Sequence, residues 1–202
     1  MQIYQFVLGP IATNTYLVAD ENTKKCFVID PAWPSPELKA KIQKEGLTPE
    51  YIILTHGHGD HTGGIDDLKA SYPDITLIAS KKERNFLYDR HISMGKGGIR
   101  ADKEVVDGDE LSVGDLKLQF ISTPGHTPGG MCVYIKSESV LFSGDTLFHT
   151  SVGRTDLDGG NFSELMSSIR EKLLVLPEDT QVLPGHDSVT TIGYEKRYNP
   201  FV

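Results

Sequence analysis

Three histidines and one aspartate stand close together in the segment Thr55-His56-Gly57-His58-Gly59-Asp60-His61. The preceding residues 51–55 are predicted to form a buried strand, and side chains at alternate positions of an extended segment project to one side. His56 and His58 can therefore reach one ion together, because the intervening glycines do not crowd it. A tight turn beyond them would let Asp60 and His61 serve a second ion. This HxHxDH pattern has roughly a one in a thousand chance of arising by accident in such a chain, so it predicts a metal site.

Three further candidate ligands each follow a predicted strand: His126 comes after Leu116–Ser122, Asp145 after Val140–Phe142 and His186 after Gln181–Leu183. Each of them alone is equally consistent with an ordinary turn residue. Together they converge on one sheet edge, where α/β enzymes commonly place their ligands. Imidazole and carboxylate groups suit zinc, with manganese and iron as alternatives. Two such ions about 3.5–4 Å apart, sharing one carboxylate, would hold a bridging water and lower its pKa toward ~7.

The remaining pattern predicts strands and helices in both halves of the chain. Further strands are expected at residues 2–7, 15–19, 26–29, 76–79 and 131–135. One helix is expected from Pro36, with Ser35 as its cap and Gly46 at its end, and a second over Gly63–Tyr72. A third is expected after Ser80, with Glu83 completing a capping box. A fourth is expected from Asn161, and its apolar face carries Phe162, Leu165, Ile169 and Leu173. Such a pattern predicts two packed sheets with helices outside, in one domain spanning residues 1–202.

Composition limits the partners and the compartment. The net charge of −8 disfavours a nucleic-acid partner, although the 20 Lys and Arg residues could still form a local basic patch. The apolar runs are too short to cross a membrane, and the first residues lack the features of a signal peptide. Cys26 and Cys132 lie inside strand-like runs, as expected of buried free thiols in a reducing cytoplasm. We therefore expect a cytoplasmic protein acting on a small molecule; its oligomeric state stays open.

At these residues the chain resembles the metallo-β-lactamase superfamily, and within it the short glyoxalase II-like (hydroxyacylglutathione hydrolase-like) hydrolases. The resemblance rests on HxHxDH and on the segments Pro124–Gly129, Gly144–Phe148, Ser151–Asp156, Thr190–Glu195 and Asn199–Phe201. It implies the α/β fold of that superfamily, a four-layer αββα sandwich. It also implies that a first metal is held by His56, His58 and His126, a second by Asp60, His61 and His186, and that Asp145 bridges both.

The resemblance also bears on the substrate. Flavodiiron proteins carry Glu where this chain has His58, and zinc β-lactamases carry Cys where it has Asp145, so neither activity is expected. Arg154 aligns with the Lys that contacts the glutathione carboxylate, whereas Asp156 replaces a neighbouring Tyr and would repel an anion. The chain ends at Val202 without the helical region that grips glutathione in full glyoxalase II proteins. A thioester hydrolase is implied, with Arg154 as the candidate substrate-binding residue.

The expected mechanism is attack of the bridging hydroxide on a thioester carbonyl that the first metal polarises, with Asp60 orienting the hydroxide. A thiolate leaves readily because the pKa of a thiol is near 8.5. The alternatives are a persulfide dioxygenase with one iron and a lactonase of the same fold. A non-enzymatic module with structural zinc is disfavoured, because structural sites usually close four ligands around one ion.

Several residues have no assigned role at this point. The glycine-containing segment 90–103 is expected to be a mobile loop, with His91 exposed at its start. His149 is expected on the surface rather than in the pocket, and Trp33 either walls the pocket or packs half-buried. Asn14 is expected to anchor backbone near the first strands.

Overall fold

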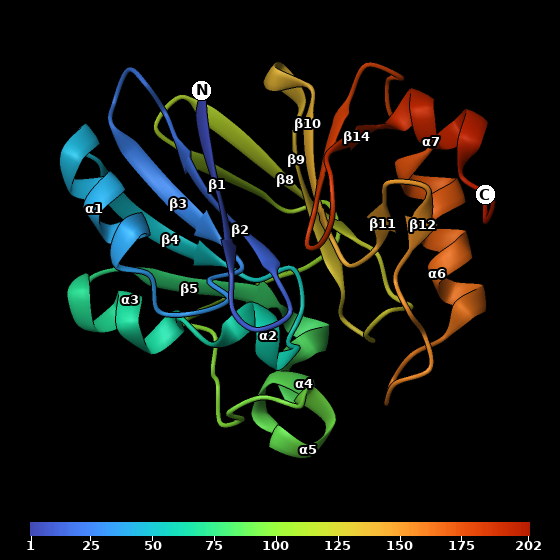
Figure 1. The fold of residues 1–202 in the computed structure, drawn as a ribbon, viewed down its shortest axis with the longest axis horizontal. Helices are drawn as coiled ribbons and strands as arrows, with labels where there is room; N and C mark the ends of the chain where they lie inside the picture. Colours follow the sequence, from blue (N-terminus) through green and yellow to red (C-terminus); the bar gives the residue numbers. More distant parts are fainter.

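Two six-stranded sheets pack face to face, with helices on both outer sides, in the computed structural model, which describes residues 1–202 (Figure 1). The first sheet has the strand order β1-β2-β3-β4-β5-β6. Its strands are β1 (Gln2–Leu8), β2 (Thr13–Ala19), β3 (Lys25–Ile29), β4 (Thr48–Ile53), β5 (Thr76–Ser80) and β6 (Lys103–Val105). Its outer side carries α1 (Pro36–Glu45) and α3 (Ile65–Ser71), and α2 (Gly59–Thr62), α4 (Arg84–Tyr88) and α5 (Arg90–Ser93) lie at one end.

The second sheet has the order β14-β13-β10-β9-β8-β7. Its strands are β7 (Glu110–Val113), β8 (Leu116–Ser122), β9 (Met131–Ile135), β10 (Val140–Gly144), β13 (Gln181–Pro184) and β14 (Thr190–Thr191). A small hairpin, β11 (Leu147–Phe148) and β12 (Ser151–Val152), lies beside α6 (Phe162–Ser168) and α7 (Ile192–Tyr198), which form the outer layer. This arrangement confirms the expected αββα sandwich. None of the helices combines the length and apolar character needed to cross a bilayer.

Three apolar clusters separate the four layers, and the alternation of side chains along each strand divides residues among them. In β2, Tyr16 and Val18 face the cluster between the sheets, whereas Leu17 and Ala19 face the cluster under α1 and α3. Both cysteines are buried and free, as expected. Because both faces of these strands are covered by apolar residues, the sheets are held firmly and the loops at their ends start from fixed positions.

Two helices begin where local capping chemistry predicts. Ser35 accepts a hydrogen bond from the Leu38 amide at the start of α1, and Gly46 ends that helix in the left-handed region at a φ of 65°. Asn161 accepts a hydrogen bond from the Glu164 amide at the start of α6. The prediction that Phe162 lies on the buried face of α6 is wrong, because Phe162 is 52% exposed. The buried face of the helix begins at Leu165.

Two further expectations are corrected by the structure. Glu83 does not complete a capping box with Ser80, because its carboxylate turns inward and Ser80 accepts instead from the Lys82 amide. The segment 90–103 is not a featureless loop. Asp89 caps the single turn of α5 by accepting from the His91 amide, and β6 pairs in parallel with β5. Short elements of this kind depend on one cap and one neighbouring strand rather than on periodicity.

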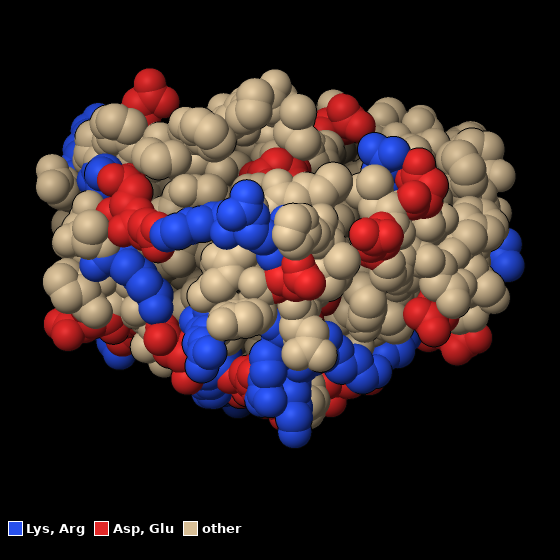
Figure 2. All heavy atoms as spheres, turned by 90° about the horizontal axis from the view of Figure 1, so that it is seen from below, with Lys and Arg blue, Asp and Glu red and all other residues tan.

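Charged side chains are mixed on the face that carries α4 and α5. Figure 2 shows lysines and arginines gathered toward the lower edge of this face, among acidic residues. Arg84 pairs with Glu104, and Lys96 pairs with Asp66. Part of the positive charge is therefore neutralised within the chain, and the absence of a nucleic-acid partner stays a prediction.

Candidate metal centre

The HxHxDH segment leaves the end of β4 as extended chain and then enters α2. His58 is the residue before the helix, with an extended φ of −62° and ψ of 147°. Asp60 and His61 lie within the single turn of α2. The predicted tight turn is thus the start of a helix, which directs the side chains before it and within it to two different places.

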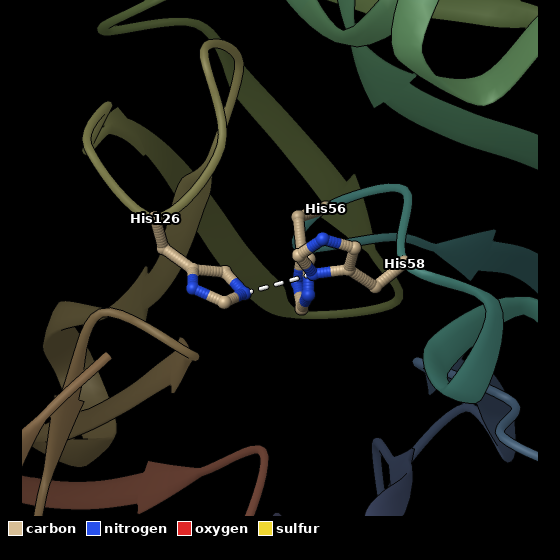
Figure 3. Close-up of side chains that lie close together, drawn as sticks. All are labelled: His56, His58 and His126. Carbon is tan, nitrogen blue, oxygen red and sulfur yellow. Dashed lines mark hydrogen bonds between the residues drawn. The ribbon is translucent and has the colours of Figure 1, made fainter. Parts of the chain in front are cut away.

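His56, His58 and His126 form a first group of converging ring nitrogens. His58 Nδ1 lies 2.9 Å from His126 Nε2, and the dashed line in Figure 3 marks this contact between loops of different sheets. The His56 ring lies 4.9 Å from that of His58 and 4.8 Å from that of His126, measured between centroids. All three side chains are buried. The structure therefore brings together the three residues expected at the first metal.

Asp60, His61 and His186 form a second group. Asp60 Oδ2 lies 3.2 Å from the Nε2 atoms of both His61 and His186. The His61 side chain is fully buried, whereas those of Asp60 and His186 are 20% and 21% exposed. The second group is thus the side of the centre that faces solvent.

Asp145, at the end of β10, lies between the two groups. Its Oδ1 is 3.4 Å from His61 Nε2, and its Oδ2 is 3.6 Å from the Nε2 atoms of His126 and His186. Gly185 packs directly against this carboxylate, and a Cβ at that position would collide with it. One carboxylate therefore contacts ligand atoms of both groups, as a bridging residue must.

Unpaired buried polar atoms mark the centre as a cation site. His56 Nε2, His58 Nε2 and Asp145 Oδ1 have no hydrogen-bond partner. Buried polar atoms without partners are rare in native proteins and destabilise the fold unless something satisfies them. A group of imidazole and carboxylate donors fits divalent transition-metal ions. The donor set therefore fits two metal ions.

The surroundings shift the pKa values of the histidines in the two groups in opposite directions. Burial lowers the pKa of His56 well below its usual range, and burial together with neighbouring histidines lowers that of His58 to about 3. Burial alone would raise the pKa of Asp60, but hydrogen bonds from His186 and His61 outweigh it and hold that pKa well below its usual range. For His61 and His186, burial favours the neutral form, but nearby carboxylates outweigh it and raise both pKa values.

Several contacts that orient the candidate ligands were not expected from the sequence. Asp30 Oδ2 lies 2.9 Å from His61 Nδ1, and Thr13 donates to Asp60 at 3.0 Å. The Arg154 carbonyl accepts from His126 Nδ1 at 2.7 Å, which leaves Nε2 free to face the centre. Asp30 directly follows the buried strand β3, so the rule that found the other candidates could have found it as well.

Asn14 anchors the loop that carries His186. Its side-chain amide donates to the carbonyls of Pro184 and Asp187, each at 3.0 Å. Asn14 therefore anchors backbone, as expected, but the expected place near the first strands is wrong, because the anchored backbone lies at and just beyond the end of β13 of the second sheet.

Arg154 forms a bidentate ion pair with Asp156 in the structure. Its Nε lies 2.7 Å from Asp156 Oδ1 and its second terminal nitrogen 2.8 Å from Oδ2. Both side chains are more than 60% exposed, so solvent screens the pair and the guanidinium can exchange partners. The structure therefore leaves a substrate-binding role for Arg154 as a prediction.

The residues to which the sequence assigns no role lie outside the two groups of candidate ligands. His91 and His149 are exposed, and His149 stacks on Tyr194 rather than reaching the centre. Trp33 is 53% exposed and lies against Gly63, which precedes α3. His91 and His149 are therefore suitable controls for substitutions in the centre.

The sequence is similar to those of several known proteins over most of its length. Residues 8–186 match the family described as the metallo-beta-lactamase superfamily. The probable metallo-hydrolase YqgX of Bacillus subtilis is 38% identical, over 96% of this chain and 94% of its own. The hydroxyacylglutathione hydrolase GloC of Haemophilus influenzae is 34% identical, over 94% and 92%. The human mitochondrial persulfide dioxygenase ETHE1 is 32% identical, over 93% of this chain and 70% of its own.

Solved structures agree over nearly the whole chain. BLEG-1, a B3 metallo-beta-lactamase, has a TM-score of 0.93 at 38% identity, covering 99% of both chains. The di-iron-bound form of TTHA1623 has a TM-score of 0.87 at 34% identity, covering 98% of this chain and 100% of its own. ETHE1 from Myxococcus xanthus has a TM-score of 0.82 at 33% identity, covering 99% and 84%.

Proposed function

Because the chain belongs to the metallo-β-lactamase superfamily, we propose that it is a binuclear metal-dependent hydrolase whose substrate is a thioester such as a hydroxyacylglutathione. The single observation that carries this proposal is the position of Asp145 between the two groups of candidate ligands. We assign His56, His58 and His126 to a first ion and Asp60, His61 and His186 to a second. We propose that residues 1–202 form one catalytic domain.

Two divalent ions in these positions would supply an activated water and polarise a substrate carbonyl. The chain's own residues would hold the two ions in place. The neutral imidazoles of His56 and His58 offer lone pairs rather than protons, because burial lowers their pKa values. Asp145 supplies the negative charge that keeps two dications close together.

The exposed side of the centre indicates where the reaction takes place. Asp60 and His186 are the most exposed members of the groups, so a substrate approaches over them. Asp60 stays ionised, since its pKa is held well below its usual range, and it can accept a hydrogen bond from the attacking water. The thiolate of a thioester leaves without a strong general acid, because the pKa of a thiol is only about 8.5.

Zinc is the proposed metal, because imidazole and carboxylate ligands suit it. Iron is the alternative, since TTHA1623 is described in a di-iron-bound form. The relative GloC supports a hydroxyacylglutathione as substrate, and its alignment covers 94% of this chain. We further propose that the protein acts in the cytoplasm on a small molecule.

A substrate panel on protein of known metal content tests this function. We expect thiol release from lactoylglutathione at a rate at least about a hundredfold above that of a lactone, with a β-lactam turned over least. The β-lactam belongs in the panel because BLEG-1, at 38% identity, is described as a B3 metallo-beta-lactamase. Faster turnover of the lactone or the β-lactam would replace the thioester as the proposed substrate.

A persulfide dioxygenase is the second candidate, because human ETHE1 aligns over 93% of this chain. That reaction consumes molecular oxygen, whereas hydrolysis does not. Oxygen uptake with glutathione persulfide, measured on iron-loaded protein, separates the two activities. Uptake at one iron per chain, together with no thiol release from thioesters, would favour the dioxygenase over the hydrolase.

A further inference from the structure

Glu83 is a fully buried carboxylate that belongs to neither group of candidate ligands. It ends the 3-10 turn Lys81–Glu83 that follows β5. Its Oε1 accepts a hydrogen bond from the Gly57 amide at 3.0 Å, and its Oε2 accepts one from the Gly129 amide at 2.7 Å. One side chain thus connects two loops that are far apart in the sequence.

Both of these loops carry ligands of the first group. Gly57 lies between His56 and His58, whereas Gly129 lies three residues after His126. The first loop leaves β4 of one sheet, and the second joins β8 to β9 of the other. The carboxylate of Glu83 therefore spans the junction at which His58 and His126 meet.

Close packing holds this carboxylate and the loops in a single arrangement. A Cβ at Gly129 would collide with the backbone and carboxylate of Glu83. A Cβ at Gly57 would come within 3.1 Å of Phe86 and Leu87, which follow in α4. Phe86 in turn lies edge-on against the His58 ring at 5.2 Å between centroids.

The chemistry of a carboxylate suits this position better than an apolar or amide group. Burial raises the pKa of Glu83 to about 7, so the ionised form needs donors around it. Two backbone amides provide them, and both oxygens accept. A glutamine would keep only one acceptor oxygen and would turn an N–H group toward the other amide.

We propose that Glu83 is a positioning residue that fixes the spacing of His58 and His126 and thereby sets the affinity of the first metal ion. This inference rests on the assignment of ligands made under the proposed function. The second group is held by other contacts, from Asp30 to His61 and from Thr13 to Asp60. Loss of Glu83 should therefore weaken the binding of the first metal ion and leave the binding of the second unchanged.

Glu195 offers a matched control, since it is also a fully buried glutamate that connects separate segments. It accepts from the Thr150 amide at 2.9 Å, from Thr190 Oγ1 at 2.5 Å and from Asn199 Nδ2 at 2.8 Å. None of these partners is a candidate ligand. Glu195→Gln therefore reproduces the loss of a buried carboxylate without touching the two metal loops.

The experiment measures zinc affinity by chelator competition in two backgrounds of the full chain. His186→Ala weakens zinc binding by the second group, so the affinity measured in this background is that of the first group. His126→Ala weakens zinc binding by the first group, so the affinity measured in that background is that of the second group. We expect Glu83→Gln to lower zinc affinity about tenfold or more in the His186→Ala background, and less than about threefold in the His126→Ala background. Glu195→Gln should change neither affinity by more than about threefold.

The unfolding temperature of each metal-free variant is measured alongside. Equal losses of affinity in both backgrounds, or equal effects of Glu83→Gln and Glu195→Gln, would overturn the proposal and leave Glu83 with a general structural role. If Glu83→Gln does not fold, Glu83→Asp is measured in the same two backgrounds, because aspartate keeps the charge but has a side chain too short to contact both amides. A loss of affinity in the His186→Ala background alone would support the proposal, and equal losses in both backgrounds would overturn it. A parent chain that binds only one zinc ion would instead contradict the proposed binuclear centre.

Discussion

His58 Nδ1 lies 2.9 Å from His126 Nε2, although 68 positions separate the two residues in the chain. His58 comes from the first sheet and His126 from the second, so the contact exists only when the two sheets have packed together. Asp145 extends the same junction to His61 and His186. The centre is therefore a product of the interface between the sheets, and metal binding should depend on residues from both.

The protein should bind close to two transition-metal ions per chain. His126→Ala should reduce this content to about one, because it removes a ligand of the first group only. Elemental analysis after zinc reconstitution measures both values. Full activity at saturation with a single ion would contradict the binuclear mechanism and would favour the dioxygenase.

Asp145→Asn should reduce turnover by at least about a thousandfold while leaving the fold intact. The amide has the shape of the carboxylate but lacks the charge that holds two dications near each other. His91→Ala is the control, since His91 is exposed and lies outside both groups. Similar losses of kcat in the two variants would show that the distinction between ligands and bystanders is wrong.

Metal binding should release protons mainly from the second group. The pKa values of His61 and His186 are raised, so metal and protons compete for their nitrogens and zinc affinity there should increase as pH rises. His56 and His58 have lowered pKa values and are already neutral near pH 7. Calorimetry in buffers of different ionisation enthalpy counts the protons. The His126→Ala protein should release more of them than the His186→Ala protein, and the reverse order would contradict this assignment.

Arg154→Ala should raise KM for lactoylglutathione by roughly tenfold, with a smaller effect on kcat and little effect on a neutral thioester. The ion pair with Asp156 allows a second variant in the opposite direction. Asp156→Asn frees the guanidinium and removes a negative charge, so it should lower KM for the anionic substrate. Equal effects of Arg154→Ala on both substrates would assign Arg154 to the structure of its loop.

Asn14→Ala should destabilise the protein by about 1–3 kcal/mol, because it removes two hydrogen bonds to backbone carbonyls at about 0.5–1.5 kcal/mol each, although Tyr16 still donates to one of these carbonyls. Those carbonyls belong to Pro184 and Asp187 on either side of His186. Chemical denaturation of the metal-free protein measures the change. Asn85→Ala serves as control, since Asn85 is exposed, and a loss no larger than that of the control would show that this anchor contributes little.

The seven candidate ligands could be found in the sequence because their signals are local. Each follows a stretch of strand-forming residues, and the pattern from His56 to His61 is rare enough to stand on its own. The two packed sheets also follow from local patterns, because strand-forming segments alternate with helical ones along the chain. The ends of α1 are likewise local, since Ser35 and Gly46 act on their own neighbours. Resemblance to a family then added the division of the ligands into two groups and the bridging role of Asp145.

Tertiary structure alone decided the contacts that orient those ligands. Glu83 stands three residues after Ser80, so local spacing predicts a capping box, but packing of the two sheets places Gly57 and Gly129 within its reach. The ligand-orienting role of Asp30 and the partners of Asn14 were settled in the same way. The physical reason is that a side chain bonds to whichever donors and acceptors surround it after folding. Those groups come mostly from distant segments, and no local period encodes them.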